Sequence, residues 1–168
     1  MTARRRRRRL IVTAALVVSA LGVAACNSSP VTTLSSPPTT DNSLTLSTLS
    51  SPAGPILATG SGQALYDFVP DTPTRSACLN DGCVFQWPPL LKSAAVTVGH
   101  GLDGTLVGTL KRPDGSTQLS YGGHPLYTYN LDVRAGMVTG QAIDQDGGLW
   151  YVLTPAGQEV HTPFTIRG

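Results

Sequence analysis

Two of the three cysteines are spaced to form a short covalent bridge. Cys78 and Cys83 enclose Leu79-Asn80-Asp81-Gly82, and asparagine, aspartate and glycine favour the tight reversal that such a bridge requires. A redox-active pair is usually C-x-x-C in a basic neighbourhood, whereas these cysteines are separated by four residues that include an aspartate. The spacing therefore predicts a structural disulfide, which is typical of an exported protein.

The third cysteine, Cys26, ends an N-terminal segment that has the pattern of an export signal. Six arginines at positions 4–9 precede an uncharged apolar run over residues 10–25. This run has 16 residues, which is short for a bilayer span and typical of a signal peptide. Its end, Val23-Ala24-Ala25-Cys26, resembles a bacterial lipobox, in which the cysteine becomes the diacylated N-terminus. We therefore expect a signal peptide over residues 1–25 and a lipid on Cys26. An ordinary secretory signal with a chance cysteine is the alternative.

Removal of residues 1–25 reverses the sign of the net charge. The whole chain has a formal charge of +2, whereas residues 26–168 keep six basic residues against ten acidic ones, a charge of −4. The arginine run therefore belongs to the signal and is not a nucleic-acid patch. The expected partners are the membrane, through the lipid, and an unidentified ligand or protein of the envelope. We expect no nucleic-acid partner, and a location at the outer face of the cell membrane.

Residues that could bind a metal or catalyse a reaction are dispersed along the chain. No two of the three histidines lie within five residues of each other, so no local ligand motif exists. They are His100, His124 and His161. The segment 144–148 begins like a calcium loop, but Leu153 occupies the place of the required glutamate. No glycine-rich phosphate loop and no G-x-S-x-G are present, and the chain has one glutamate, Glu159. We predict no metal, no cofactor and no catalytic residue, unless dispersed aspartates and histidines converge in the fold.

A six-residue pattern occurs twice with an offset of 61 residues. The two copies are Tyr66-x-Phe68-x-x-Asp71 and Tyr127-x-Tyr129-x-x-Asp132. Residues two apart on a strand face the same way, so each aromatic pair shares one face. The aspartates would follow the strands and accept N–H bonds from the backbone two or three residues on. This arrangement predicts core aromatics and turn-capping aspartates. The alternative is an open aromatic face that stacks on a sugar or an apolar ligand.

The elements that carry these residues are predicted to be short strands. Runs rich in β-branched and aromatic residues flank turn signals at 60–62, 112–115 and 155–157, which predicts three hairpins. A helical turn is expected only around Pro88–Ala94. The fixed offset indicates two copies of one unit of about 61 residues. We therefore predict a mainly β fold in which two repeats pack as one small domain.

The segment between Cys26 and this domain has a different composition. Residues 27–55 contain 19 Ser, Thr or Pro among 29 and a single charge. Such a composition offers too little apolar surface to offset the entropy of ordering. We therefore expect a flexible stalk over residues 26–55 and the two-repeat domain over residues 56–168.

The paired motif resembles that of a bacterial envelope family, the secreted-repeat lipoproteins named for Y-x-[FWY]-x-x-D. In that family a cysteine pair and W-P-P-L follow the first motif, D-G-x-x-Q and G-x-P-L-Y precede the second, and G-x-W-Y-V follows it. The matching stretches are Cys78, Cys83, Trp87-Pro88-Pro89-Leu90, Asp114-Gly115-Ser116-Thr117-Gln118, Gly123-His124-Pro125-Leu126-Tyr127 and Gly148-Leu149-Trp150-Tyr151-Val152. The resemblance covers about residues 58–157. It implies an exported protein of unknown function, and some family members are associated with alkane utilisation.

Together these patterns favour a membrane-anchored, non-catalytic envelope protein that binds or scaffolds an unidentified ligand. A second hypothesis is an extracytoplasmic redox or metal-handling accessory that uses Cys78 and Cys83 with a histidine. Further alternatives are a role in the uptake or use of apolar substrates such as alkanes, and a hydrolase with dispersed catalytic residues. An open aromatic groove would favour the first hypothesis, and a histidine beside the cysteines would favour the second.

Overall fold

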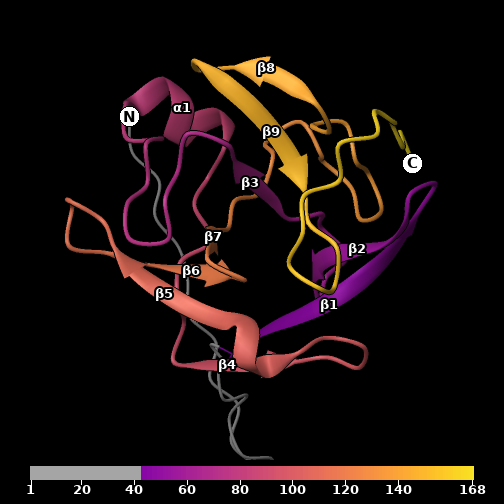
Figure 1. Cartoon of the computed structure of the whole chain (residues 1–168), viewed down its shortest axis with the longest axis horizontal. Helices are drawn as coiled ribbons and strands as arrows, with labels where there is room; N and C mark the ends of the chain where they lie inside the picture. Colours follow the sequence, from indigo (N-terminus) through magenta and orange to yellow (C-terminus); the bar gives the residue numbers. More distant parts are fainter. Residues whose placement is uncertain (1–42) are drawn as a thin grey trace, which may run out of the picture. The chain divides into compact units, whose positions relative to one another are not determined.

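The computed structural model describes residues 43–168 of the chain (Figure 1). The predicted signal peptide, Cys26 and residues 26–42 of the predicted stalk lie outside the described residues. Within residues 43–168, no helix is both long enough and apolar enough to cross a membrane.

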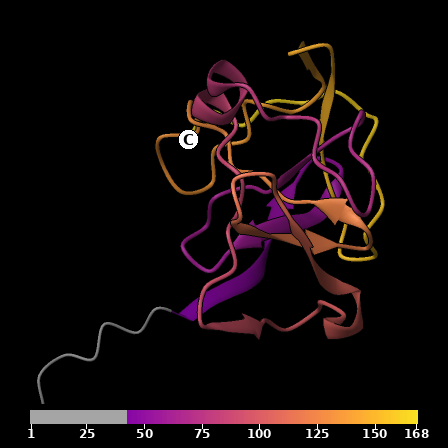
Figure 2. The ribbon, with the colours of Figure 1, turned by 90° about the vertical axis from the view of Figure 1, so that its left-hand side faces the viewer.

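Short strands dominate the described residues, so the prediction of a mainly β fold is confirmed. They form three sheets of three strands each, with the orders β2-β1-β4, β3-β9-β8 and β5-β6-β7. The strands are β1 (Ser43–Ser51), β2 (Gly54–Thr59), β3 (Tyr66–Phe68), β4 (Ala95–Val98), β5 (Val107–Lys111), β6 (Thr117–Tyr121), β7 (His124–Pro125), β8 (Ile143–Gln145) and β9 (Gly148–Val152). The helices are α1 (Asp81–Gln86) and a single 3-10 turn, Gly104–Leu106. Figures 1 and 2 show α1 and β4 at opposite ends of this domain.

The predicted stalk is wrong for residues 43–55, because these residues form β1 and the start of β2. β1 pairs antiparallel with β2 and parallel with β4. Three leucines explain the ordering: Leu46 is fully buried in one core cluster, Leu44 packs against the same cluster, and Leu49 packs against the other. The spacing of these leucines, which the Ser/Thr/Pro content obscured, provides the apolar surface that orders the strand. The β domain therefore includes residues 43–55.

The helix lies earlier in the chain than the helical turn expected around Pro88–Ala94. Asn80, predicted to form part of a reversal, is instead the N-cap of α1, and its side chain accepts a bond from the Cys83 N–H. The segment after Trp87 runs extended, because the N–H and C=O of Leu90 pair with Leu126 and Leu119. These long-range backbone bonds leave the segment unavailable for a helix.

The two repeats each begin with a hairpin, β1–β2 in the first and β5–β6 in the second. Thr48 pairs with Leu57 in one hairpin, and Thr109 pairs with Leu119 in the other. Both turns have the form Pro-x-Gly, with the glycines Gly54 and Gly115 at φ values of 94° and 84°. The predicted hairpins around 60–62 and 155–157 are also present, through the bridges Ala58–Ala64 and Leu153–Glu159. The first repeat thus starts before the predicted boundary at residue 56.

The repeats interlock, since each motif pairs with the tryptophan segment of the other repeat. β3 pairs with β9, which places Phe68 opposite Trp150. In the equivalent place, the N–H of Asn130 bonds to the C=O of Gln86 at 2.9 Å. The two motifs meet at Tyr66 and Tyr127, whose backbones exchange two bonds of 2.9 Å. An approximate two-fold axis therefore passes between these tyrosines, and neither repeat completes its own core.

Four aromatic rings form a continuous stack across this axis. The order is Phe68, Trp150, Trp87, Tyr129, with centroid separations of 4.2, 4.0 and 4.1 Å. The two tryptophans, one from each repeat, lie nearly parallel at the centre. Tyr66 and Tyr127 close the sides with edge-on contacts. The motif aromatics are thus the centre of the core rather than an open face, and rings of this size dominate burial in a small domain.

Candidate functional site

The motif aspartates pair with tyrosines across the repeats. The hydroxyl of Tyr66 donates to Asp132 Oδ2 at 2.6 Å, and the hydroxyl of Tyr127 donates to Asp71 Oδ2 at 2.6 Å. The second oxygen of each aspartate accepts backbone N–H groups six or seven residues on, from Ala77 and Thr139. The expectation of caps two or three residues on is therefore wrong, because the crossed pairing brings more distant donors closer.

Burial is the largest cause that raises the pKa of Tyr66 and of Tyr127, and the adjacent aspartates raise both further. Both hydroxyls therefore remain protonated donors at physiological pH. We interpret the two crossed pairs as structural bonds of the core and not as acid–base groups.

The predicted disulfide between Cys78 and Cys83 is confirmed, with Cα atoms 5.6 Å apart. Both cysteines are buried. Arg112 holds this loop: its guanidinium donates to Cys78 O at 2.7 Å and to Gln118 Oε1 at 2.7 Å. No polar contact of either cysteine in the described part of the chain involves a histidine, so the geometry does not support a redox site built from a cysteine and a histidine.

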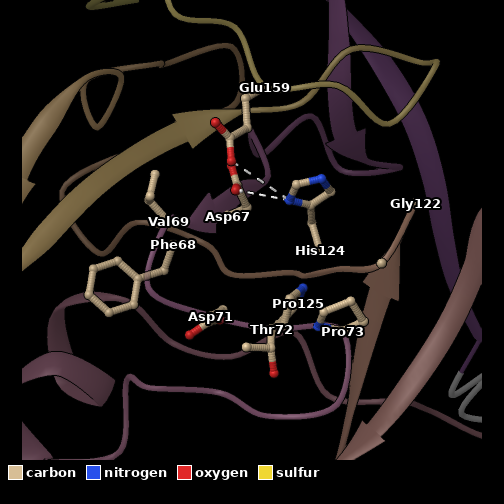
Figure 3. Close-up of a pocket in the computed structure, with 11 residues that line it drawn as sticks. Asp67, Phe68, Val69, Asp71, Thr72, Pro73, Gly122, His124, Pro125 and Glu159 are labelled. Carbon is tan, nitrogen blue, oxygen red and sulfur yellow. Dashed lines mark hydrogen bonds and ion pairs between the residues drawn. The ribbon is translucent and has the colours of Figure 1, made fainter.

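A polar cluster that sequence reasoning missed lies on the other side of β3. Its members, which we call the Asp67 cluster, are Asp67, His124 and Glu159. His124 Nδ1 lies 3.1 Å from Asp67 Oδ2 and 4.0 Å from Glu159 Oε1 (Figure 3). His161 extends the cluster, because its Nε2 lies 3.3 Å from Glu159 Oε2. A histidine and two carboxylates thus converge from three segments of the chain.

Local structure explains the convergence. Asp67 lies between the two motif aromatics of β3, so strand alternation points it to the opposite face of the strand from the ring stack. His124 opens β7 after a tight turn at Gly122 and Gly123, whose φ values of 59° and 89° favour glycine. A Cβ on Gly122 would lie 3.1 Å from the Cα of Gly157, so this turn packs directly on the turn that precedes Glu159. The contact between the two glycine turns brings His124 and Glu159 together.

The electrostatics of the cluster centre on Asp67. Its side chain is 1% exposed, and its Oδ1 has no hydrogen-bond partner. Burial raises the pKa of Asp67 to about 6; the bond from His124 opposes this shift, and the charge of Glu159 adds to it. The hydrogen bond with Asp67 raises the pKa of His124 in turn. Near neutral pH the cluster therefore holds two carboxyl groups against at most one positive imidazole.

The cluster opens into a cavity of about 140 Å³. The lining includes Asp71 and Thr72 besides the three cluster residues. Both carboxylate oxygens of Asp71 are already occupied, by Tyr127 and Ala77. Ligand pockets for organic molecules of drug size span roughly 300–1,000 Å³, and one water occupies about 30 Å³. The cavity therefore suits an ion with a few waters rather than a sugar or an alkyl chain.

The two repeats differ where the cluster is built. In the aligned motif segments, Gln63 stands where the second repeat has His124, and Thr128 stands where the first has Asp67. A pair required by the fold would be expected in both repeats, as the crossed tyrosine–aspartate pairs are. This difference within the repeat alignment was the signal that could have identified Asp67 and His124 from the sequence. No such signal marked Glu159, apart from its being the only glutamate.

Comparison with known protein families identifies one match. Residues 108–154 match a family described as a secreted repeat of unknown function. The matched segment starts in β5 and ends just after β9, so it spans most of the second repeat. The resemblance to secreted-repeat proteins is thereby confirmed over this segment, and it indicates an exported protein. No curated protein and no solved structure matches the chain significantly.

Proposed function

We propose that this protein is a lipid-anchored, non-catalytic binding module of the cell envelope whose ligand site is the Asp67 cluster. The lipid would be attached to Cys26, and the β domain would stand at the outer face of the membrane. The family match over residues 108–154 supports export. The remainder of the proposal rests on the lipobox-like sequence and on the geometry of the cluster.

The main support for this binding site is a difference between the two repeats: both contain the residues that build the core, but Asp67 and His124 each occur in only one of the two motif segments. The residues that the motifs share are used in the ring stack and the crossed pairs. The Asp67 cluster occurs once, lines a cavity and contains a buried oxygen without a partner. A buried polar atom without a partner destabilises the fold unless a ligand or an ion satisfies it. A binding function explains why this arrangement is present in one repeat.

The lining of the cavity favours binding over catalysis. Among the residues that line it, Thr72 has the only hydroxyl, and there is no cysteine, lysine or arginine. The cavity therefore lacks a serine, cysteine or lysine nucleophile and a lysine or arginine that would hold a developing oxyanion. Its carboxylates would also repel phosphate, which agrees with the absence of a nucleic-acid role in the proposal.

Two measurements test the proposal. Cys26→Ala should release the protein from the membrane into the aqueous phase of a cell extract, or block removal of residues 1–25. A variant that is normally processed and still partitions into the detergent phase would contradict the lipid anchor. For the site, low-molecular-weight solutes extracted from the envelope should raise the melting temperature of the detergent-solubilised wild-type chain. The same extract should leave His124→Gln unchanged, since glutamine is the residue at the equivalent position of the first repeat. Equal stabilisation of both proteins would place the binding site elsewhere.

A further inference from the structure

We propose that Asp67, His124 and Glu159 together bind one divalent transition-metal cation, for which Zn²⁺ is the suitable probe. The inference rests on the proposed function for the location of the binding site and adds the chemical class of the ligand. The sequence predicted no metal site, because no two histidines lie close together in the chain.

The spacing of the donor atoms fits a metal ion. The three donor atoms lie within 4.8 Å of one another, and the Asp67 and His124 atoms are 3.1 Å apart. Three ligands of a tetrahedral zinc at about 2.0–2.1 Å are separated from each other by about 3.3 Å. Small side-chain rotations at Glu159, which is partly exposed, would bring its oxygen from 4.0 Å to this separation from His124 Nδ1. All three separations are at most 4.8 Å, within about 1.5 Å of the value for a bound ion.

The negative charge of the two carboxylates in the Asp67 cluster supports a bound cation. Asp67 is nearly inaccessible to solvent, and its free Oδ1 has no donor in the described structure. Glu159 adds a second negative charge. His124 faces both carboxylates, whereas the exposed His161 contacts only Glu159, so His124 is the one basic side chain that contacts Asp67 in the described residues. Taking carboxylates out of water is costly unless each is paired. A divalent cation would balance both carboxylates and leave His124 as a neutral ligand through Nδ1.

The groups around the cluster would orient its ligands. His161 Nε2 contacts the Glu159 oxygen that does not face His124. The ring of His161 rests edge-on against Tyr151, at a centroid distance of 4.7 Å. Outer partners of this kind fix the orientation of ligating side chains in metal sites. His161 is therefore a positioning residue in this proposal, with its side chain 69% exposed.

The donor set selects the class of cation. One imidazole nitrogen and two carboxylate oxygens suit Zn²⁺ and neighbouring transition metals, whereas Ca²⁺ requires six to eight oxygens. Mg²⁺ retains several waters in an octahedral shell and does not favour imidazole. A cavity of about 140 Å³ leaves room for a few waters beside the ion. The coordination positions of the ion that the three side chains leave open would be filled by water, so the bound ion would be able to exchange with solution.

Equilibrium dialysis of the full-length, detergent-solubilised protein tests the proposal. The protein is stripped with a chelator and dialysed against Zn²⁺, Ca²⁺ or Mg²⁺, and the bound metal is measured by mass spectrometry. We expect one Zn²⁺ per chain and no bound Ca²⁺ or Mg²⁺ at the same concentration. Asp67→Asn, His124→Gln and Glu159→Gln should each weaken zinc binding at least tenfold, and His161→Gln by a smaller factor. Melting temperatures in chelator show whether each variant is folded.

The matched control is His100→Gln, which removes an exposed histidine outside the cluster. It should bind zinc as the wild type does. Absence of stoichiometric zinc on the wild type, or undiminished binding by folded His124→Gln and Glu159→Gln, would overturn the proposal. Stabilisation of the wild type by envelope solutes without any zinc binding would overturn the metal inference alone and leave the proposed binding function standing. Cys26→Ala fractionation is independent of both outcomes.

Discussion

The crossed pairs Tyr66–Asp132 and Tyr127–Asp71 connect residues that are 66 and 56 positions apart in the chain. Each pair joins a hydroxyl to a carboxylate in a site from which solvent is largely excluded, where such bonds are short and comparatively strong. The Asp67 cluster lies one residue away from the first pair but faces the other way. Adjacent residues of β3 therefore have different roles: Tyr66 packs in the core, and Asp67 lines the cavity.

Tyr66→Phe tests the crossed pairs, because it keeps the ring and removes only the hydroxyl. Asp132 would lose one donor, and the N–H of Gly140 would lose its acceptor. We expect a loss of about 1–3 kcal/mol in the free energy of unfolding, measured by chemical denaturation. Tyr151→Phe is the matched control: within residues 43–168 its hydroxyl has no hydrogen bond, so the substitution should change stability by less than about 0.5 kcal/mol. Equal effects of the two substitutions would contradict a structural role of the pair.

Phe68→Ala tests the ring stack. The substitution removes the end ring of the stack, which lies 4.2 Å from Trp150, and leaves a cavity in the core. A loss of about 3–5 kcal/mol is expected, a large part of the roughly 5–15 kcal/mol available to such a domain. Asp71→Ala should cost less, about 1–2 kcal/mol, because its side chain is partly solvated. If thermal melts show Phe68→Ala to be as stable as the wild type, the assignment of the motif aromatics to the core is contradicted.

The pH dependence of stability tests the electrostatics of Asp67 in metal-free protein. Its pKa is about 6 in the folded state against about 4 in the unfolded state, so the folded state binds the proton more tightly. Stability should therefore fall as pH rises from 4 to 6. The raised pKa of His124 acts in the same direction, because the stability that its protonated form contributes is lost as the pH rises further. The free energy of unfolding of both proteins is measured by denaturation in chelator. The value for Asp67→Asn relative to that of the wild type should rise by about 1–3 kcal/mol between pH 4 and pH 8. A constant difference between the two proteins would contradict the raised pKa.

At the scale of elements, the hairpin β1–β2 extends the first repeat into a segment of low apolar content. β1 has its counterpart in β5, and the two hairpins share the Pro-x-Gly turn, whereas their pairing registers differ by one residue. β1 also bonds to β4, so it is the central strand of its sheet. A strand in this position is an integral part of the fold rather than an extension of a linker.

Leu46→Ala measures what β1 contributes. The side chain is fully buried in the cluster formed with Leu57 and Leu65, and truncation should cost about 2–5 kcal/mol. Thr48→Ala changes an exposed residue of the same strand and should stay within about 0.5 kcal/mol. Both are measured as shifts of the denaturation midpoint. If Leu46→Ala behaved like Thr48→Ala, β1 would contribute little to the fold.

At the scale of the whole molecule, the interlocking of the repeats predicts a single cooperative unit. Residues 43–99 and 100–168, expressed separately, would each lack the strand partners and half of the ring stack that the other supplies. We expect neither half to show a cooperative thermal transition by circular dichroism, while residues 43–168 within the full chain unfold in one step. Cooperative melting of an isolated half would show that a repeat can complete its own core.

The sequence by itself determined the local features of this protein. These features are the hairpin turns, the disulfide and the shared strand face of Tyr66 and Phe68. Each depends on residues within a few positions of each other, so turn preferences and strand alternation predict it. The repeat offset also predicted two copies of one unit. Composition misled only where its average concealed the spacing of three leucines in β1.

Tertiary structure decided which copy pairs with which. Because the repeats have matching patterns, pairing within a repeat and pairing across the axis satisfy the same local rules. Long-range contacts, namely the ring stack and the crossed tyrosine–aspartate bonds, favour the crossed form. The Asp67 cluster depends on the same choice: His124 lies 57 residues from Asp67, and Glu159 lies in yet another hairpin. Their convergence follows from the contact of two glycine turns at Gly122 and Gly157, which no spacing along the chain encodes.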